Sequence, residues 1–368
     1  MNADELAVRL AVASARRVVV KVGSSSLASA KGGLNDAALE RLVDALAAQR
    51  AASREIVLVT SGAIAAGCEP LGMTRRPVDL AQQQAAAAVG QGRLIARYTE
   101  AFAAHGITVA QVLVTVADIS RRASYTNALR TFGALTRLGV TPIVNENDTV
   151  ATREIRFGDN DRLAALVAEM VRARALVLLS DVDGLYTAHP DLPGATRVSF
   201  VPRVGRLVAD VDRPGSSVGS GGMASKIESA RMAANAGIPV VVAACDQVSE
   251  ALDGRPVGTA FAPSSKRRPR RLLWLADASV AQGRVHIDAG AVAALTGGSA
   301  SLLMAGVHQV EGVFEAGDPV DVVGPDGQLV ARGLVGRSSA DLASSLGERF
   351  GHEVIHRDDM VMIKKAKQ

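Results

Sequence analysis

The sequence predicts an α/β protein in which a mainly parallel sheet lies between two layers of helices, followed by a small β-rich domain. Three observations lead to this prediction. Nearly continuous apolar runs alternate with helical patterns as far as Phe261, as in parallel sheets covered on both faces. Polar clusters follow most of these runs directly. Beyond Phe261, a basic, proline-containing stretch leads into short runs of β-type sequence.

The composition sets the class of protein. The 368 residues provide for roughly two domains. Hydrophobic residues make up 48 % of the chain, enough for a sizeable core, and the formal net charge of +4 is too small to imply general affinity for nucleic acid. Cys68 and Cys245 are the only cysteines, which argues against a disulfide framework. No apolar run approaches the roughly 18 residues of a membrane span, and no signal peptide is evident, so we expect a cytoplasmic protein.

The expected elements of the sheet domain follow from hydrophobic periodicity. Strands are predicted at 18–22, 56–60, 108–114, 140–144, 175–179 and 238–242. Helices are predicted at 35–51, 79–104 and 124–138, from Leu163 onward, and from the glycine loop before Lys226 to about Ala236. Residues 1–15 are expected to form a short surface helix or a loose tail, and residues 189–215 to be irregular.

The remainder of the chain has a different character. Short β-type runs are predicted at 284–287, 301–307, 310–314, 319–323 and 329–334. Pro325-Asp326-Gly327 is typical of a hairpin turn. The expected divisions are an N-terminal extension at 1–15, the α/β domain at 16–263, a basic linker at 264–278, the β-rich domain at 279–357 and a tail at 358–368.

The stretch from Asn145 to Asp161 is the strongest functional signal. It follows one predicted strand and ends where a helical pattern begins, with Leu163 as its first apolar member. Its amides and carboxylates are too polar for a core and too rich in carboxylate for a simple turn. One interpretation is an Asn/Asp-rich loop that caps the next helix. The other is a binding site, because ligands of open α/β sheets bind at the carboxyl ends of the strands.

Two lysines lie beside turns of small residues. Lys21 stands inside an apolar strand that ends directly before Gly23-Ser24-Ser25-Ser26. Its side chain either snorkels at a strand edge or faces phosphate oxygens. Lys226 follows a second loop, 219–222, and would lie in the first turn of a helix, where a lysine opposes the helix dipole. A bound anion explains that placement better. Neither loop matches the Walker or GxGxxG pattern, so each alone is weak evidence.

Further polar residues follow other predicted strands. Ser61-Gly62-Ala63 follows the second and Ser180-Asp181 the fifth, and either could be only a tight turn or a helix cap. Loops gathered at one edge of a sheet nevertheless predict an enzyme. Two lysines with anion-binding turns indicate phosphoryl transfer, which needs positioning and charge neutralisation more than a protein nucleophile. The carboxylate and amide cluster indicates a small polar substrate that carries an amine.

Taken together, these motifs resemble the amino-acid kinase family. The segments that carry the resemblance are 20–24, 59–67, 145–148, 157–161, 183–187 and 221–223. The late block resembles a PUA domain, a small pseudo-barrel that is also found in RNA-modifying enzymes. The resemblance covers about residues 16–357, and within the family it is to the members that phosphorylate glutamate in the first step of proline biosynthesis.

The resemblance implies transfer of the γ-phosphate of ATP to the side-chain carboxylate of L-glutamate. It assigns phosphate contacts to Lys21 and Lys226, and the positioning of both lysines to Asp161. Glutamate would be held by Ser61, Asp148 and Asn160. The residues expected at ATP, besides the two lysines, are Ser180, Asp181, Ser220, Gly221, Gly222, Met223, Ala224 and Ser225. Mg²⁺ is expected to bridge the phosphates, largely through water and without a ligand from the protein. Feedback inhibition by proline and a homo-oligomer, a dimer or a tetramer, are also expected.

Two alternatives remain at this stage. One is another activity of the same family, on N-acetylglutamate, aspartate, carbamate or a nucleoside monophosphate. Asp148, if it binds a free α-amino group, argues against acetylglutamate, and the late block does not resemble the regulatory domains of aspartate kinases. The other alternative is RNA binding through the PUA-like block and the basic run 266–271. We favour a solvated linker for that run.

Overall fold

The computed structural model describes residues 1–29, 33–150, 160–188, 190–204, 222–264, 269–298, 300–347 and 352–363. The chain divides into two compact units. The first, the α/β unit, comprises Met1–Asp118 and Thr126–Arg267. The second, the β-rich unit, comprises Ile119–Tyr125 and Arg268–Gln368. In the described part of the chain, no helix is both long and apolar enough to cross a membrane.

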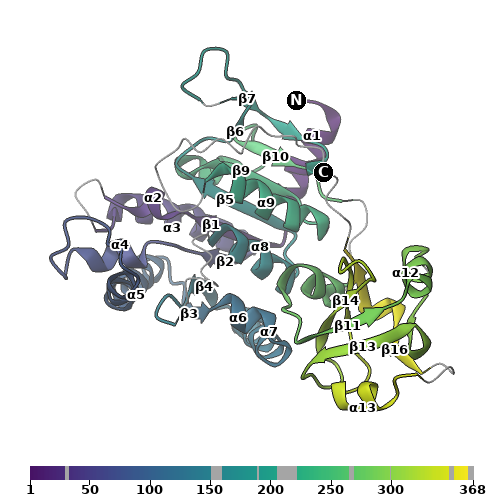
Figure 1. Cartoon of the computed structure of the whole chain (residues 1–368). Coiled ribbons are helices and arrows are strands. Elements are labelled where there is room, and N and C mark those ends of the chain that lie inside the picture. Colours follow the sequence, from purple (N-terminus) through teal and green to yellow (C-terminus); the bar gives the residue numbers. More distant parts are fainter. Residues whose placement is uncertain are drawn as a thin grey trace. The chain divides into compact units, whose positions relative to one another are not determined.

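The α/β unit is built on one sheet with the strand order β3-β4-β2-β1-β5-β9-β10-β8 across the described residues (Figure 1). Its strands are β1 (Arg17–Val22), β2 (Glu55–Val59), β3 (Val109–Val114), β4 (Thr141–Glu146), β5 (Ala175–Ser180), β8 (Phe200–Val201), β9 (Val240–Ala244) and β10 (Thr259–Phe261). Each neighbouring pair is parallel except β9 and β10. The predicted mainly parallel sheet is therefore confirmed.

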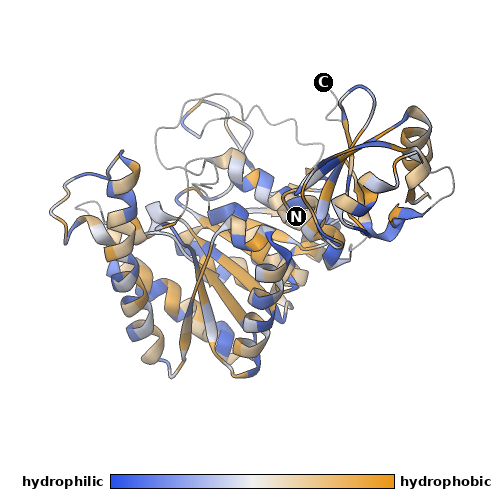
Figure 2. Cartoon of the chain, turned by 60° about the horizontal axis from the view of Figure 1, so that its bottom comes forward, coloured by the Kyte–Doolittle hydropathy of each residue, from blue (hydrophilic) through white to orange (hydrophobic). Residues whose placement is uncertain are grey.

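Helices lie on both faces of this sheet, as the α/β prediction requires (Figure 1). They are α1 (Ala3–Ala13), α2 (Ser24–Leu27), α3 (Asp36–Ala51), α4 (Ala63–Cys68), α5 (Leu80–Ala103), α6 (Val116–Ser120), α7 (Arg122–Arg137), α8 (Asn160–Met170), α9 (Met223–Asn235) and α10 (Val248–Leu252). Figure 2 shows apolar strands between helices of mixed polarity, which is the pattern of a buried sheet.

The central strand β1 presents valines to a hydrophobic cluster on one face and Lys21 on the other face. Val18, Val20 and Val22 join the hydrophobic cluster that includes Leu39 of α3. Successive side chains of a strand point to opposite faces, so Lys21 points to the face on which α8 packs against β1. An apolar strand can thus carry a lysine without placing its charge in this cluster.

The β-rich unit contains a mixed sheet with the order β13-β11-β14-β15-β17 in its described residues. Its strands are β11 (Gly283–Ile287), β12 (Leu302–Leu303), β13 (Val307–Gly312), β14 (Pro319–Val323), β15 (Leu329–Leu334), β16 (Glu353–Ile355) and β17 (Met360–Met362), and its helices are α11 (Arg270–Leu273), α12 (Ala289–Thr296) and α13 (Ser339–Ser344). β14 and β15 are antiparallel, and Gly327 between them has a φ of +71°, so the predicted hairpin is confirmed. Within this unit, Trp274 Nε1 donates to the carbonyl of Ile119 at 2.7 Å.

Several elements differ from the sequence predictions. Residues 1–15 are not a loose tail, because α1 buries Val8 and Val12 together with the charged Glu5 and Arg9. Residues 189–215 are not wholly irregular, since they include β8 and the strand β7 (Arg197–Val198), which pairs with β6 (Leu185–Tyr186). The run 301–307 is not one strand, because a tight 3₁₀ turn at Met304–Gly306 separates β12 from β13.

Candidate active site

Three charged side chains from three elements meet at the carboxyl edge of the sheet. Lys21 lies in β1, Asp161 in the first turn of α8 and Lys226 in the first turn of α9. Asp161 Oδ1 lies 2.5 Å from Lys21 Nζ, and Asp161 Oδ2 lies 3.1 Å from Lys226 Nζ. The relative exposure is 4 % for Lys21, 0 % for Asp161 and 6 % for Lys226. The structure therefore brings together the two lysines expected at the phosphates and the aspartate expected to position them.

The charges of this cluster suit a phosphate group. Buried charges are costly unless they are paired and hydrogen-bonded, and Asp161 gives each lysine one carboxylate oxygen. Two lysines and one aspartate carry a net positive charge between them. The carboxylate also lies in the first turn of α8, where the helix dipole favours an anion. An anion that reaches both ammonium groups would balance the remaining charge.

A hydrogen-bond network lies next to this cluster, at the carboxyl ends of β2 and β4. Asn160 Nδ2 lies 2.9 Å from the carbonyl of Thr60, 2.7 Å from Ser61 Oγ and 3.1 Å from Asn145 Oδ1. Asn145 Nδ2 in turn donates to Gln91 Oε1 at 2.8 Å. Asn160 precedes Asp161 directly, so the first turn of α8 contributes to both groups of residues. Ser61 and Asn160, both predicted to hold glutamate, are thus in direct contact.

Helix α5 supports this network with residues that the sequence analysis did not identify. Gln91 binds Asn145, and the hydroxyl of Tyr98 lies 2.9 Å from Thr60 Oγ1. Burial raises the pKa of Tyr98, so its hydroxyl stays neutral and available for this hydrogen bond. Both residues belong to an Ala/Gln-rich helix whose pattern indicates no function. The scarcity of tyrosine, with three in the whole chain, is the one signal that could have drawn attention to Tyr98.

Helix α4 holds Ser61 in place by lying unusually close to α5. Gly62, its N-terminal cap, has a φ of +106°, a conformation that favours glycine. A Cβ atom on Gly67 would lie 1.8 Å from the carbonyl oxygen of Ala86, and one on Gly90 would lie 1.8 Å from that of Ala63. The two backbones therefore touch, and the turn that carries Ser61 is fixed against the helix that carries Gln91.

The residues expected at ATP occupy two other positions on the same edge. Ser180 ends β5, is buried, and donates through Oγ to Asp181 Oδ1 at 3.0 Å, while Asp181 is exposed. Gly222 caps α9, whose first residues are Met223, Ala224, Ser225 and Lys226. Ser220 and Gly221 lie outside the described residues, as do positions 157–159 of the stretch before α8.

Two further features bear on substrate and metal. Asp148 follows the end of β4 by two residues and is half-buried. Within the described ranges, no three His, Cys, Asp or Glu side chains are grouped so that they could hold a metal ion.

Comparisons with known proteins agree with this architecture. A model of the amino acid kinase family matches residues 16–244, and one of the PUA domain matches residues 283–365. The chain is 55 % identical over 370 residues to the glutamate 5-kinase of Cutibacterium acnes, which covers 98 % of this chain and 95 % of that protein. It is 56 % identical to the glutamate 5-kinase of Salinispora arenicola, with 96 % and 99 % covered.

A solved structure shows the same fold at low sequence identity. Carbamate kinase from Giardia lamblia bound to AMP-PNP has a TM-score of 0.51 and 16 % identity, with 68 % of this chain and 100 % of that chain covered. The family match spans more than half of this chain, and the relatives match almost all of it. The chain therefore belongs to the glutamate 5-kinase group of the amino acid kinase family and carries a C-terminal PUA domain.

Proposed function

We propose that this protein transfers the γ-phosphate of ATP to the side-chain carboxylate of L-glutamate, giving L-glutamyl 5-phosphate and ADP as the first step of proline biosynthesis. The observation that carries the proposal is the buried cluster of Lys21, Asp161 and Lys226 directly beside the Asn160–Ser61 network. A cationic phosphate site next to a group of polar side chains is what such a transfer needs. The full-length similarity to glutamate 5-kinases supports the choice of substrate.

The reaction assigns a role to each half of the site. A carboxylate oxygen of glutamate forms the new bond to the γ-phosphorus while the bond to the β-phosphate oxygen breaks, so the substrate itself is the nucleophile. Lys21 and Lys226 neutralise charge on the migrating group, and Asp161 orients both ammonium groups. Their burial strengthens these electrostatic interactions relative to water.

Glutamate lies, in this proposal, at the carboxyl ends of β2 and β4. Ser61 and Asn160 supply polar contacts, and Asp148 pairs with the α-ammonium group. The support for the first two is their mutual hydrogen bond of 2.7 Å beside the phosphate cluster. A charge-assisted bond from Asp148 would distinguish a free amino acid from its N-acetylated form.

ATP lies between the end of β5 and the start of α9. Ser180 and Asp181 are proposed on one side and residues 220–226 on the other, where the helix N-terminus favours phosphate. We propose that a magnesium ion is held there mainly by phosphate oxygens and water, as Mg²⁺ commonly is. Bound there, the ion would neutralise phosphate charge.

We extend the proposal to regulation and assembly. Proline shares an α-carboxylate and an α-amine with glutamate, so a site that recognises those groups can accept it as a competitor. We also propose a homo-oligomer, a dimer or a tetramer, on the similarity to the family. Inhibition curves at several glutamate concentrations and light scattering of the purified protein test these two points separately.

The decisive experiment measures substrate choice. Purified protein with ATP, magnesium and L-glutamate should form an acyl phosphate that hydroxylamine traps as the hydroxamate. N-acetylglutamate, aspartate and carbamate are the matched comparisons. Equal activity with N-acetylglutamate would contradict the proposal, because the site would then not recognise a free amine.

A further inference from the structure

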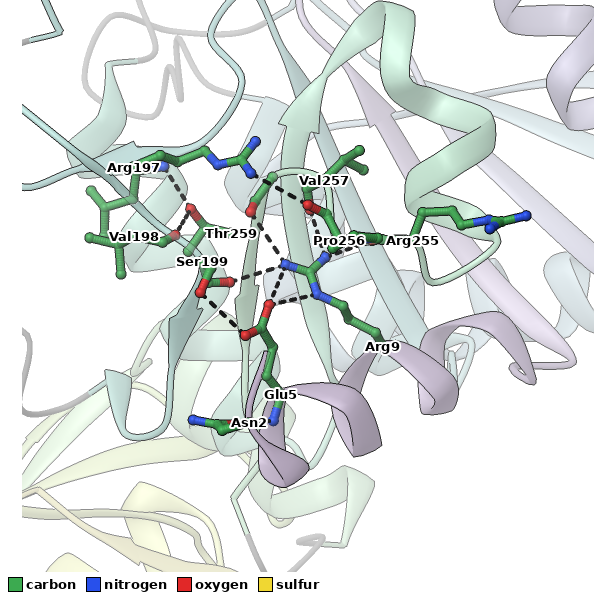
Figure 3. Close-up of polar contacts among 12 residues, drawn as sticks. Asn2, Glu5, Arg9, Arg197, Val198, Ser199, Arg255, Pro256, Val257 and Thr259 are labelled. Carbon is green, nitrogen blue, oxygen red and sulfur yellow. Dashed lines mark hydrogen bonds and ion pairs between the residues drawn. The ribbon is translucent and has the colours of Figure 1, made fainter.

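Helix α1 places a fully buried ion pair against the edge of the sheet (Figure 3). Arg9 has a relative exposure of 0 % and Glu5 of 3 %. They lie one helical turn apart, and Arg9 Nε donates to Glu5 Oε1 at 2.9 Å. Glu5 Oε2 also accepts a hydrogen bond of 3.2 Å from Ser199 Oγ. Burying a charged pair this deeply costs free energy, so the pair requires a structural or functional explanation.

The guanidinium group of Arg9 binds backbone carbonyls from two segments. Nη1 donates to the carbonyls of Arg255 at 2.9 Å and Val257 at 2.6 Å. Nη2 lies 3.2 Å from the carbonyl of Ser199 and 3.4 Å from that of Gly258. One planar group thus fixes the turn that leads into β10 together with the residue that precedes β8. Unsatisfied carbonyls buried at this point would be costly.

Thr259, the next residue along, connects this turn to the hairpin formed by β6 and β7. Its Oγ1 donates to the carbonyl of Val198 at 2.6 Å and accepts from the amide of Leu185 at 2.8 Å. Its side chain is fully buried. A single hydroxyl therefore holds both strands of the hairpin, and its position depends on the backbone that Arg9 binds.

The hairpin begins beside the residues proposed at ATP. Asp183, three residues after Ser180, accepts from Tyr186 OH at 2.8 Å and from Arg197 Nη1 at 3.3 Å. Arg197 Nη2 also lies 3.4 Å from the carbonyl of Pro256, within the turn that Arg9 fixes. A continuous set of contacts runs from α1 to the loop after β5.

We propose that Arg9, oriented by Glu5, is a positioning residue for the nucleotide half of the active site. It touches no reacting atom. It fixes residues 255–259, and Thr259 then fixes the hairpin whose first turn borders the nucleotide. The proposal rests on the proposed function in placing ATP beside Ser180 and Asp181. A lysine cannot replace this arginine, because a single ammonium group cannot reach the same set of carbonyls.

The first test compares two buried arginines. Arg54 has a relative exposure of 7 % and donates to the carbonyls of Ala15, Leu252 and Val12, none of which belongs to the hairpin or its supporting turn. We expect Arg9→Met and Arg54→Met both to lower Tm. Only Arg9→Met, and equally Arg9→Lys, should raise the KM for ATP, on the order of tenfold or more, because a displaced binding group weakens its contacts. The KM for glutamate should stay unchanged.

The second test leaves Arg9 in place, which keeps the proposal testable even if Arg9→Met does not fold. Thr259→Val preserves shape and removes the hydroxyl. It should raise the KM for ATP as Arg9→Met does, and the double variant should be no worse than the more severe single variant, because both act through one route. Hydrogen exchange at the amide of Leu185 should accelerate in each variant.

Calorimetry with an ATP analogue and no amino acid separates this proposal from the proposed function. A wild-type protein that binds nucleotide but does not phosphorylate glutamate would refute only the proposed function. Positioning by Arg9 would be refuted if folded Arg9→Met bound nucleotide as tightly as wild type, if the KM for glutamate rose equally, or if Thr259→Val left the KM for ATP unchanged.

Discussion

Asp161 uses its two carboxylate oxygens separately, one for Lys21 and one for Lys226. This division gives each ammonium group a carboxylate oxygen of its own. Removing one partner of a buried ion pair commonly costs about 3–5 kcal/mol, because the other charge is left uncompensated. Variants at these positions must therefore be checked for folding before their kinetics are interpreted.

Lys226 should matter most in the transition state, where charge on the migrating phosphoryl group is redistributed. We predict that Lys226→Ala lowers kcat by about 10²–10³, as loss of one transition-state donor does in other enzymes. Steady-state kinetics measure the effect, and an unchanged cooperative thermal unfolding curve is the control. An intact kcat would mean that the glycine loop before α9 is only a helix start.

Asp148 should act on glutamate alone, since it follows β4 and not the nucleotide loops. Asp148→Asn keeps the shape and removes the charge that we propose pairs with the α-ammonium group. We predict a rise of about tenfold to a hundredfold in the KM for glutamate, equivalent to a charge-assisted hydrogen bond, with little change for ATP. If the variant weakened ATP and spared glutamate, the substrate half would be assigned to the wrong residues.

Among single residues, the sequence identifies those that do not fit their local pattern. A lysine within an apolar strand and a lysine in the first turn of a helix both conflict with simple propensity, and both lie in the cluster. Gln91 and Tyr98 conflict with nothing in their helix. Their importance comes only from contacts with Asn145 and Thr60, more than 35 residues away, which no local pattern encodes.

Among the elements, α4 and α5 form a tightly constrained pair, because their backbones touch at Gly67 and Gly90. We predict that Gly67→Ala destabilises the protein by about 1–3 kcal/mol, the usual cost of overpacking, because its new methyl group would meet the backbone of Ala86. It should also raise the KM for glutamate, since α4 begins directly after Ser61-Gly62. Thermal unfolding and initial rates measure the two effects.

Gly92→Ala is the matched control for that prediction. Gly92 lies in α5, and a Cβ atom there would meet no atom within 4 Å. The change should stabilise the helix by up to about 1 kcal/mol, because alanine has the higher helix propensity. If Gly67→Ala were equally harmless, close contact between α4 and α5 would not position Ser61.

How well a helix or strand can be predicted from the sequence depends on its length. The long apolar runs gave strands close to the expected bounds, as for β5 at Ala175–Ser180. β8 and β10 have two and three residues, too few to show any period, and they form only because the edge of the sheet accepts them. α1 could not be identified as buried, because Glu5 and Arg9 look like surface residues until each is seen to satisfy the other.

For the whole molecule, the residues proposed for chemistry all lie in the α/β unit. We predict that a chain ended at Pro263 still phosphorylates glutamate, with an altered response to proline or magnesium allowed. It would lose Trp274, which binds the carbonyl of Ile119 and lies 6.0 Å from the ring of Tyr125. We therefore expect Tm to fall by several degrees, since loss of a packed Trp commonly costs about 3–5 kcal/mol.

Turnover per folded molecule is the measurement that decides this prediction. Trp274→Ala in the full chain is the control, because it removes the same packing and keeps the PUA domain. A folded, shortened chain without any turnover would show that the β-rich unit contributes directly to the site.

The position of Arg9 also determines when the protein can finish folding. Arg9 and the carbonyl of Gly258 are 249 residues apart in the sequence. A ribosome that adds about 5–20 residues per second needs on the order of 10–50 s to make the intervening chain. Helix α1 leaves the ribosome early, but the backbone that its guanidinium binds is made only near the end of the α/β unit. The first helix of the chain is therefore among the last elements of its unit to be locked in place.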